Sequence, residues 1–212
     1  MAMRTIEEVM NLAPVIPVLT IKRAERAVPL ARALLAGGLR VLEITLRTDV
    51  ALDAVRAIAQ SVPEAVPGVG TVTTPEDLSE ARAAGAQFAV SPGFSSDLVT
   101  AAGDLPYLPG IATASEAMAA QRIGLRCLKF FPAEAMGGII TLGALAGPFP
   151  SLIFYPSGGV GRNNAREYLS LDNVCCVGGS WVAPEEDIES ERWEEITKLA
   201  SEFSSFCAYP NL

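Results

Sequence analysis

Lys129 is the residue of this sequence whose type and surroundings point most directly to chemistry. It lies inside the apolar run Cys127–Pro132, which has the length and flanking aromatics of a buried strand. Burying an ammonium group is costly unless the group is paired or gives up its proton. A lysine held as the neutral amine is a nucleophile for carbonyl carbons. The run therefore predicts a lysine that can form an imine with a ketone.

The sequence contains no histidine, which removes the most common general base and every Ser-His or Cys-His pair. The four cysteines, Cys127, Cys175, Cys176 and Cys207, include no Cys-x-x-Cys pair. No zinc site is therefore expected, and we interpret the cysteines as small apolar residues of a protein in the reducing cytoplasm. Catalysis is left to lysine, carboxylates, hydroxyls and backbone, without a metal.

Polar residues also follow one another at every second position of a second apolar run, Arg40–Arg47. Glu43, Thr45 and Arg47 share one face of this predicted strand, and the leucines and isoleucine between them share the other. A buried carboxylate needs a proton or a cationic partner. If this face and that of Lys129 meet, Glu43 can move protons for chemistry at the amine.

Each of these two residues also has a structural interpretation. Glu43 could form a purely structural ion pair with Arg47 or with Lys129, although buried pairs stabilise poorly and usually persist for another reason. Lys129 could instead be a surface lysine on an edge strand, with its stem buried and its amine in water.

The elements that must position these residues alternate along the chain at a spacing of about 20 to 26 residues. Eight β-rich runs are expected as strands: Val15–Thr20, Arg40–Arg47, Val66–Val69, Phe88–Ser91, Tyr107–Gly110, Cys127–Phe131, Leu152–Ser157 and Val174–Gly178. Alanine-rich stretches between them are expected as helices: Ala24–Ala36, Val50–Gln60, Pro75–Ala84, Ser96–Ala102, Ala114–Arg122, Ile139–Leu145 and Asn163–Leu169, with a last helix from Glu189 to about Phe206.

Alternating strands and helices imply parallel pairing through right-handed crossovers, either in a closed barrel or in an open doubly wound sheet. The count of eight at even spacing favours a (β/α)8 TIM barrel, and no Gly-x-Gly-x-x-Gly motif supports a dinucleotide-binding sheet. No linker divides the chain, so residues 1–212 are expected to form a single domain. In such a barrel, Glu43 and Lys129 can meet in the lumen.

Glycine-rich turns follow several of these strands, at the end where barrels carry their sites. Ser157-Gly158-Gly159 ends the seventh strand, and Gly178-Gly179-Ser180 ends the eighth. Loops in these two positions commonly bind phosphate through backbone amides. Thr71 and the Ser91-Pro92-Gly93 turn lie at the same predicted rim. Thr71 taken alone is more typical of a turn residue than of a ligand.

The overall composition excludes several classes of partner. The net charge of −8 and the isoelectric point near 4.7 argue against nucleic acid and anionic membranes. The start of the chain has no apolar core of signal-peptide length. The uncharged stretch Ala135–Gly161 is too dense in glycine and proline for a membrane span. A small anionic ligand is still compatible with this charge.

With these motifs in place, the chain resembles the 2-keto-3-deoxy-6-phosphogluconate aldolase family, the class I lyases of the Entner–Doudoroff pathway. The likeness extends from about Val15 to Lys198. Its most specific motifs are Glu43-Ile44-Thr45-Leu46-Arg47-Thr48 and Lys129-Phe130-Phe131-Pro132-Ala133-Glu134, and it is also carried by Pro17-Val18, Gly68-Val69-Gly70-Thr71-Val72, Gly85-Ala86-Gln87-Phe88-Ala89-Val90-Ser91-Pro92-Gly93, Gly147-Pro148-Phe149 and Gly178-Gly179-Ser180-Trp181.

The resemblance implies a role for each site residue. Lys129 would form the Schiff base and Glu43 would be the acid and base. Arg47 and Thr71 would hold the substrate carboxylate, and Phe131 and Pro92 would shape the pyruvate pocket. The phosphate would be bound at Ser157, Gly158, Gly159, Gly179 and Ser180.

The same resemblance implies a cytoplasmic homotrimer that splits 2-dehydro-3-deoxy-6-phosphogluconate to pyruvate and glyceraldehyde 3-phosphate without a cofactor. It also implies cleavage of 4-hydroxy-2-oxoglutarate to pyruvate and glyoxylate. Two positions differ from the family: Ser157 replaces a frequent threonine, and Thr20 stands where some relatives have arginine.

Three other functions are compatible with parts of the sequence. An aldolase of the same kind could prefer the galactonate epimer or an unphosphorylated 4-hydroxy-2-oxo acid. A deoxyribose-phosphate aldolase would need a second lysine near the first, whereas Lys22 and Lys198 lie in predicted surface segments. A non-catalytic barrel that binds sugar phosphates would be expected to lack the nucleophile or the base, and both are present.

Overall fold

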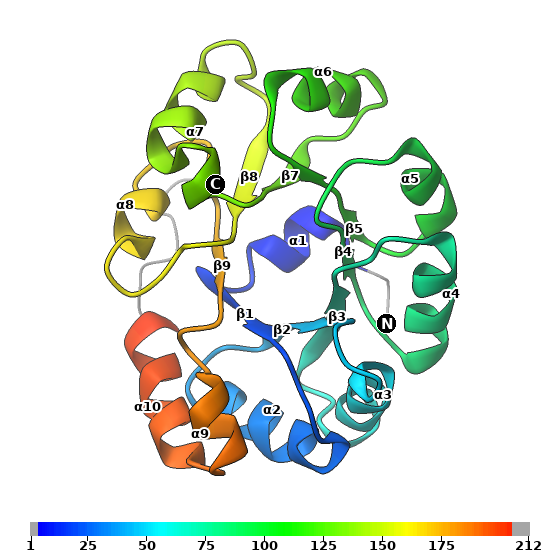
Figure 1. The fold of residues 1–212 in the computed structure, drawn as a ribbon, viewed down its shortest axis with the longest axis vertical. Helices are drawn as coiled ribbons and strands as arrows, with labels where there is room; N and C mark the ends of the chain where they lie inside the picture. Colours follow the sequence, from blue (N-terminus) through cyan, green and yellow to red (C-terminus); the bar gives the residue numbers. More distant parts are fainter. Residues whose placement is uncertain (1–3, 205–212) are drawn as a thin grey trace.

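The computed structural model describes residues 4–204, and short strands alternate with helices along them (Figure 1). The apolar runs of the sequence form the strands close to the expected bounds. They are β1 (Val15–Leu19), β2 (Val41–Thr45), β3 (Val66–Gly70), β4 (Ala89–Val90), β5 (Tyr107–Leu108), β6 (Gly110–Ile111), β7 (Cys127–Phe130), β8 (Ile153–Pro156) and β9 (Val177–Gly179).

The strands pair in parallel in two sheets, with orders β5-β4-β3-β2-β1-β9 and β6-β7-β8. The predicted strand Tyr107–Gly110 is divided at Pro109, which has no N–H to donate to the ladder. Two isolated β-bridges connect the region of β8 with β9 and the residues just before it. They pair Phe154 with Val174 and Ser157 with Gly178. The fold is therefore α/β, with parallel strands that curl rather than form a flat, two-faced sheet.

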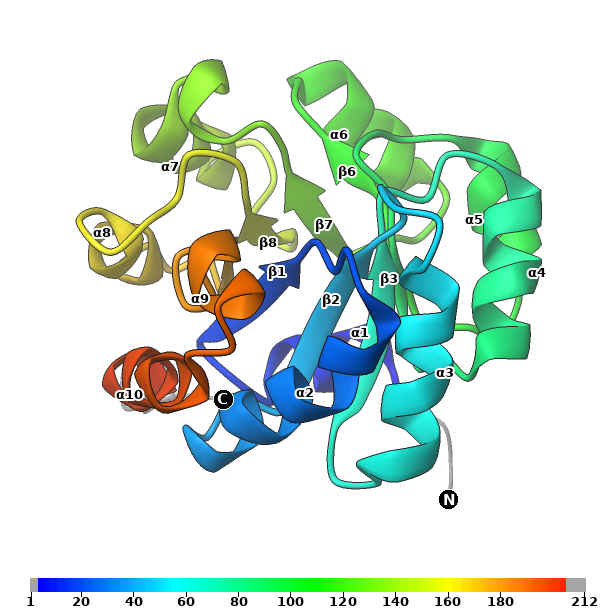
Figure 2. The same ribbon diagram turned by 60° about the horizontal axis from the view of Figure 1, so that its bottom comes forward.

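The helices lie on the outer side of the curled strands, except the first, which lies inside their curve (Figures 1 and 2). They are α1 (Ile6–Met10), η1 (Ala24–Arg26), α2 (Ala27–Ala36), α3 (Ala51–Ser61), α4 (Pro75–Ala84), α5 (Ser96–Ala102), α6 (Ala114–Arg122), η2 (Glu134–Met136), α7 (Gly138–Ala146), α8 (Ala165–Leu169), α9 (Glu185–Glu189) and α10 (Trp193–Ser204). Helices α4, α5 and α6 have the predicted bounds because Thr74, Ser95 and Thr113 cap their first turns.

Two parts of the helix prediction were wrong. We expected no helix before the first strand, although Thr5 and Glu8 form a capping box at the start of α1. The last helix, expected from Glu189, begins at Trp193 as α10, and a separate helix, α9, ends at Glu189. Glu191 between them adopts a left-handed φ of 56°. The expected end near Phe206 lies outside the described residues. Nowhere in residues 4–204 is there a helix long and apolar enough to cross a bilayer.

The alternation of side chains along the strands produces two separate apolar layers. One face of each strand packs against the outer helices, and Leu42, Ile44 and Leu128 belong to this layer. The opposite face forms an inner cluster that also contains Val9 and Met10 of α1. Because Leu42 and Ile44 face the helices, Glu43 and Thr45 face the interior, as the alternation in the sequence predicted.

Candidate active site

The interior of the curled strands contains a buried pair of opposite charges, Lys129 on β7 and Glu43 on β2. Nζ of Lys129 donates to Oε1 of Glu43 at 3.1 Å. The Lys129 side chain is 6% exposed and the Glu43 side chain 1% exposed, so the interpretation of Lys129 as a surface lysine was wrong. Glu43 therefore pairs with Lys129. Arg47, the other cation that could have paired with Glu43, instead donates a hydrogen bond to Thr71.

The second oxygen of Glu43 is bound by Tyr155 of β8, a contact that the sequence did not indicate. The hydroxyl of Tyr155 donates to Oε2 at 2.8 Å. Burial raises the pKa of Tyr155 well above its ordinary value, and the negative charge of Glu43 raises it further. The phenol is therefore a proton donor to the carboxylate throughout the neutral range.

Aromatic rings enclose the amine of Lys129 on the sides that Glu43 leaves open. Nζ lies 5.2 Å from the ring centroid of Phe131 and 5.7 Å from that of Tyr155. Rings at this distance attract the ammonium form through their negative faces, while they exclude water from it. Lys22 and Lys198 are both exposed, so neither supplies a second buried amine.

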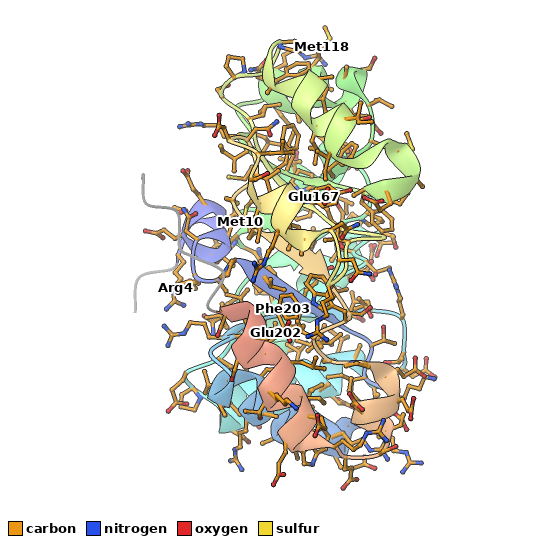
Figure 3. All side chains as sticks on the ribbon, turned by 90° about the vertical axis from the view of Figure 1, so that its left-hand side faces the viewer. Arg4, Met10, Met118, Glu167, Glu202 and Phe203 are labelled. Carbon is orange, nitrogen blue, oxygen red and sulfur yellow. The ribbon has the colours of Figure 1, made fainter. Side chains whose placement is uncertain are left out.

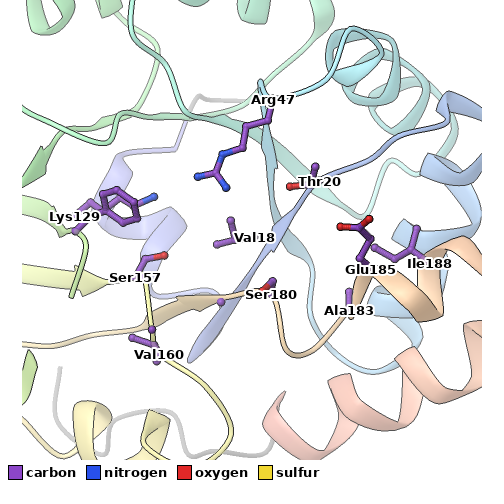
Figure 4. Close-up of a pocket in the computed structure, with 14 residues that line it drawn as sticks. Val18, Thr20, Arg47, Lys129, Ser157, Val160, Ser180, Ala183, Glu185 and Ile188 are labelled. Carbon is purple, nitrogen blue, oxygen red and sulfur yellow. The ribbon is translucent and has the colours of Figure 1, made fainter. Parts of the chain in front are cut away.

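A pocket of about 270 Å³ opens above Lys129, at the carboxyl ends of the strands (Figure 4). Arg47, Lys129 and Ser157 point into it from different elements. Seven of the predicted binding residues and the predicted nucleophile line the pocket: Arg47, Lys129, Phe131, Ser157, Gly158, Gly159, Gly179 and Ser180. Val18, Thr20, Val160, Ala183, Glu185 and Ile188 complete the lining.

Two predicted binding residues, Thr71 and Pro92, are not among the residues that line this pocket. Thr71 accepts a hydrogen bond from Nε of Arg47 at 3.2 Å, and its own backbone has a φ of 66°. Pro92 lies in the turn after β4. Its carbonyl packs tightly on Gly110, and a Cβ on Gly110 would overlap this carbonyl. Thr71 thus helps to fix the direction of Arg47, and Pro92 packs against the backbone of β6.

The rim opposite Arg47 is made of glycines in conformations that other residues rarely adopt. Gly158 and Gly159 have φ angles of 91° and 84°. A Cβ on Gly158 would also lie 3.0 Å from the ring of Phe131. The absence of side chains leaves backbone exposed to the pocket, which is the arrangement that anion-binding loops use.

The pocket also contains a charge that the sequence did not lead us to expect. Glu185 of α9 lines it and forms an ion pair with Lys22. Thr20, which we noted only as a departure from relatives, lines the same wall and exchanges a hydrogen bond with Thr45 at 3.0 Å. Tyr155 lies two residues before Ser157 and so on the same strand face, but within an apolar run the sequence does not distinguish it from a core residue.

The cysteines of the described chain are free thiols in apolar surroundings. Burial raises the pKa of Cys127 to about 12, and it also raises that of Cys176. Thiols in this state are poor nucleophiles. Cys207 lies outside the described residues. Within residues 4–204, no three Asp, Glu, His or Cys side chains are grouped as metal ligands would be.

Fold and site together define a class: an α/β enzyme on curled parallel strands, whose candidate nucleophile is a buried amine beside a carboxylate. The chain belongs to the KDPG and KHG aldolase family, which its sequence matches over residues 6–199. It is 53% identical to a 2-dehydro-3-deoxy-phosphogluconate aldolase of Dickeya dadantii, over 92% of this chain and 93% of the relative. It is 52% identical to the KHG/KDPG aldolase of Escherichia coli K12, with the same shares of 92% and 93%.

Solved structures of this family have the same fold. KDPG aldolase from Legionella pneumophila, with pyruvate captured at low pH as a covalent carbinolamine intermediate, has a TM-score of 0.93 and 46% identity over 95% of this chain and 98% of that chain. The Zymomonas mobilis ZM4 aldolase with 3-phosphoglycerate has a TM-score of 0.90 and 46% identity, covering 97% and 98%.

Proposed function

We propose that this protein is a class I aldolase that cleaves 2-dehydro-3-deoxy-6-phosphogluconate to pyruvate and D-glyceraldehyde 3-phosphate in the Entner–Doudoroff pathway. The observation that carries the proposal is the buried pair of Lys129 and Glu43 beneath the pocket. The names of the Dickeya dadantii and Escherichia coli relatives support the substrate. The covalent carbinolamine of the Legionella pneumophila structure supports an imine mechanism.

The reaction begins when the amine of Lys129 attacks the C2 ketone of the substrate. The amine must first lose its proton, and Glu43 is the acceptor within hydrogen-bond distance. Glu43 returns this proton to the carbinolamine hydroxyl, which leaves as water, and the iminium ion that forms accepts the electron pair of the breaking bond. Glu43, directly or through a water, takes the proton of the C4 hydroxyl, and the C3–C4 bond breaks. Glyceraldehyde 3-phosphate leaves.

The remaining enamine takes a proton at C3, and water then hydrolyses the imine to release pyruvate and the free amine. Because the iminium ion is the electron sink, the reaction uses no metal ion and no organic cofactor. Chelators are therefore expected to leave the activity unchanged.

The substrate is bound at both ends of the pocket. Arg47, held by Thr71, is suited to a bidentate contact with the carboxylate. Phe131 lines the pocket and, together with Pro92, is assigned to the pyruvate end. The small residues of the opposite rim, Ser157, Gly158, Gly159, Gly179 and Ser180, are assigned to the phosphate.

A second aldol cleavage, of 4-hydroxy-2-oxoglutarate to pyruvate and glyoxylate, uses the same imine. The observation that favours it is the double name, KHG/KDPG aldolase, of the Escherichia coli relative. The contacts assigned to Lys129 and Arg47 involve only the pyruvate half of that substrate, and the C4 hydroxyl that Glu43 deprotonates is present in both substrates.

The complete architecture that we propose is a single-domain, closed (β/α)8 barrel over residues 1–212. The bridges from β8 to the segment of β9 and the chain that runs directly from β5 to β6 support closure. The inner apolar cluster draws on residues from Val9 to Cys176, which supports one domain.

We assign this enzyme to the cytoplasm as a homotrimer. The free thiols and the phosphorylated substrate support the compartment. Support for assembly comes from Met118 of α6 and Ile140 of α7, whose side chains are 62% and 84% exposed; Met118 extends from one end of the molecule in Figure 3. Light scattering on the purified protein should give three times the mass of one chain, and a monomer would contradict the assignment.

Imine formation is tested by trapping with pyruvate and borohydride, followed by peptide mapping. The adduct is expected on Lys129 and should be absent from a Lys129→Ala variant that retains its fold by circular dichroism. Exposed Lys198 provides the matched control, because Lys198→Ala should trap normally. No adduct, or an adduct on Lys22 or Lys198 alone, would remove the mechanism. Pyruvate release from the phosphorylated substrate, followed with lactate dehydrogenase, tests the reaction itself.

A further inference from the structure

Tyr155 is a buried residue with a polar group that the mechanism above does not use. It is completely buried, and on the paired strands β7 and β8 it is the register partner of Lys129. Its ring therefore extends from the same sheet face as the Lys129 side chain. Its hydroxyl and the Lys129 amine bind different oxygens of one carboxylate, Oε2 and Oε1 of Glu43.

Two glycines on other strands leave the space that this arrangement needs. A Cβ on Gly178 of β9 would overlap the Tyr155 hydroxyl, and a Cβ on Gly70 of β3 would overlap Oε1 of Glu43. The carboxylate and the phenol are thus enclosed by backbone from both sides. The two glycines thus fit closely around the Tyr155 hydroxyl and the Glu43 carboxylate. A core filled only by apolar side chains would not need glycine at both positions.

A carboxylate that transfers protons must present one oxygen in one direction. A side-chain carboxylate with a single donor can rotate and exchange its oxygens, whereas a second donor on the other oxygen prevents the exchange. The donor also stabilises the ionised form in a place where burial opposes it. Because its pKa is raised well above the ordinary value, the Tyr155 hydroxyl keeps the proton that it donates.

Resting on the aldolase function proposed above, we propose that Tyr155 is a positioning residue. Its hydroxyl fixes Oε2 of Glu43, so that Oε1 alone exchanges protons with Lys129 and with the bound substrate.

Other titratable groups also face this carboxylate. Lys129 approaches it from β7, and the thiol of Cys176 lies near it on the segment before β9, where the thiol of Cys175 interacts with Tyr155. Burial raises the pKa of Cys176 well above its ordinary value, so this thiol stays neutral in the acid range used below. A change in the acid limb on removal of the phenol can therefore be assigned to the carboxylate and not to this thiol.

The test compares three measurements on Tyr155→Phe. These are borohydride trapping of pyruvate on Lys129, the exchange of the pyruvate methyl protons with D₂O, and kcat and KM for cleavage. Trapping should persist because the amine is intact. Methyl exchange and kcat should fall by about 10- to 100-fold, as expected for a misplaced proton-transfer group. KM should change little, and the acid limb of the kcat profile should move to higher pH because the carboxylate has lost a donor.

Tyr168→Phe is the matched control. Tyr168 is also buried, and its hydroxyl also donates to a glutamate, Glu134, away from the Lys129 amine. This variant should exchange the pyruvate methyl at the wild-type rate. A second comparison places Tyr155→Phe in a Glu43→Gln background. Since Tyr155 acts through Glu43, the double variant should be no slower than Glu43→Gln alone.

Three outcomes would overturn the proposal: normal methyl exchange in Tyr155→Phe, an equal loss in Tyr168→Phe, or additive losses in the double variant. If Tyr155→Phe does not fold, 3,5-difluorotyrosine incorporated at position 155 keeps the shape and strengthens the donor. The acid limb should then move to lower pH, and no movement would count against the proposal. Failure of the wild-type protein to trap pyruvate would instead remove the aldolase function itself.

Discussion

Gly70 and Glu43 lie on neighbouring strands with no room for a methyl group between them, since a Cβ at position 70 would overlap Oε1 of the carboxylate. The backbone of β3 therefore sets where the acid–base group can be. Both residues lie inside motifs that carried the family resemblance, and the contact gives a physical reason for a glycine at this position.

Gly70→Ala is expected to displace the carboxylate and to lower kcat by about 100-fold, because a shift of about 1 Å is enough for such a loss. Pyruvate trapping on Lys129 should be reduced less than turnover. Gly143→Ala in α7 is the control, because a Cβ there meets nothing within 4 Å. That variant should retain activity and melt at the same or a slightly higher temperature. Full activity in Gly70→Ala would show that the carboxylate is free to move.

Glu43→Gln should slow turnover far more than it weakens pyruvate binding. The amide keeps the shape of the carboxylate but cannot accept and return a proton, and general acid–base groups contribute about 10²- to 10⁴-fold. Steady-state cleavage and pyruvate inhibition measure the two effects separately. Equal losses in kcat and in pyruvate affinity would assign Glu43 to binding rather than to proton transfer.

The Lys129–Glu43 pair was predictable because both residues break an apolar strand pattern, and the two-residue period fixes which way each side chain points. Tyr155 was not predicted, since a tyrosine in a β-rich run is indistinguishable from an apolar core residue. Its function depends on Gly70 and Gly178, which are more than 100 residues apart in the chain. Only the folded arrangement shows that they flank one carboxylate.

The helices also include some ends that the sequence predicts and some that it does not. The start of α4 was predictable because Thr74 and Asp77 form a local capping box. The break between α9 and α10 was not, because Glu191 adopts a left-handed conformation without a glycine to signal it. Arg26 forms ion pairs with Glu189, the last residue of α9, and with Glu191 in the break itself, which shows that tertiary contacts accompany the break.

Lys129→Met is expected to destabilise the fold by up to about 3 kcal/mol, because Glu43 would be left buried without its cation. Adding Glu43→Gln should recover most of this loss, since the amide carries no charge. Denaturant unfolding of the wild type, both single variants and the double variant gives the coupling free energy between Lys129 and Glu43. Additive losses would mean that the two charges do not interact in the folded protein.

Stability should fall with pH above about 10, the ordinary pKa of tyrosine. Burial raises the pKa of Tyr155 well above that value, so the folded chain keeps a proton that the unfolded chain releases. The stabilisation is complete below the unfolded pKa and is lost as pH rises toward the folded one, by up to ~1.4 kcal/mol per pH unit.

Burial raises the pKa values of Tyr107 and Cys127 as well, so the slope of the wild type is a sum. Denaturant unfolding at pH 9 and above, with Tyr155→Phe as the reference, isolates the contribution of Tyr155. The variant should lose less stability per pH unit than the wild type. Parallel slopes would show that the Tyr155 phenol ionises alike in both states.

Glu185 is the carboxylate that lines the pocket beside the rim assigned to phosphate, and Lys22 neutralises it in an ion pair. Both side chains are about half exposed, at 52% and 57%, so the pair is screened and modest in energy. Lys22→Met should raise KM for the phosphorylated substrate by about two- to fivefold, because the uncompensated carboxylate repels the anion. Glu185→Gln in the same chain should reverse the effect.

Pyruvate methyl exchange should be unchanged in all of these variants, because pyruvate carries no phosphate. Glu186→Gln is the matched control, since Glu186 neighbours Glu185 but pairs with Arg192 and does not line the pocket. The increase in KM caused by Lys22→Met should also shrink at high salt, because exposed charges are screened within about 8 Å at physiological ionic strength. An increase in KM that persists in the Lys22→Met/Glu185→Gln double variant would show that Lys22 binds the phosphate itself.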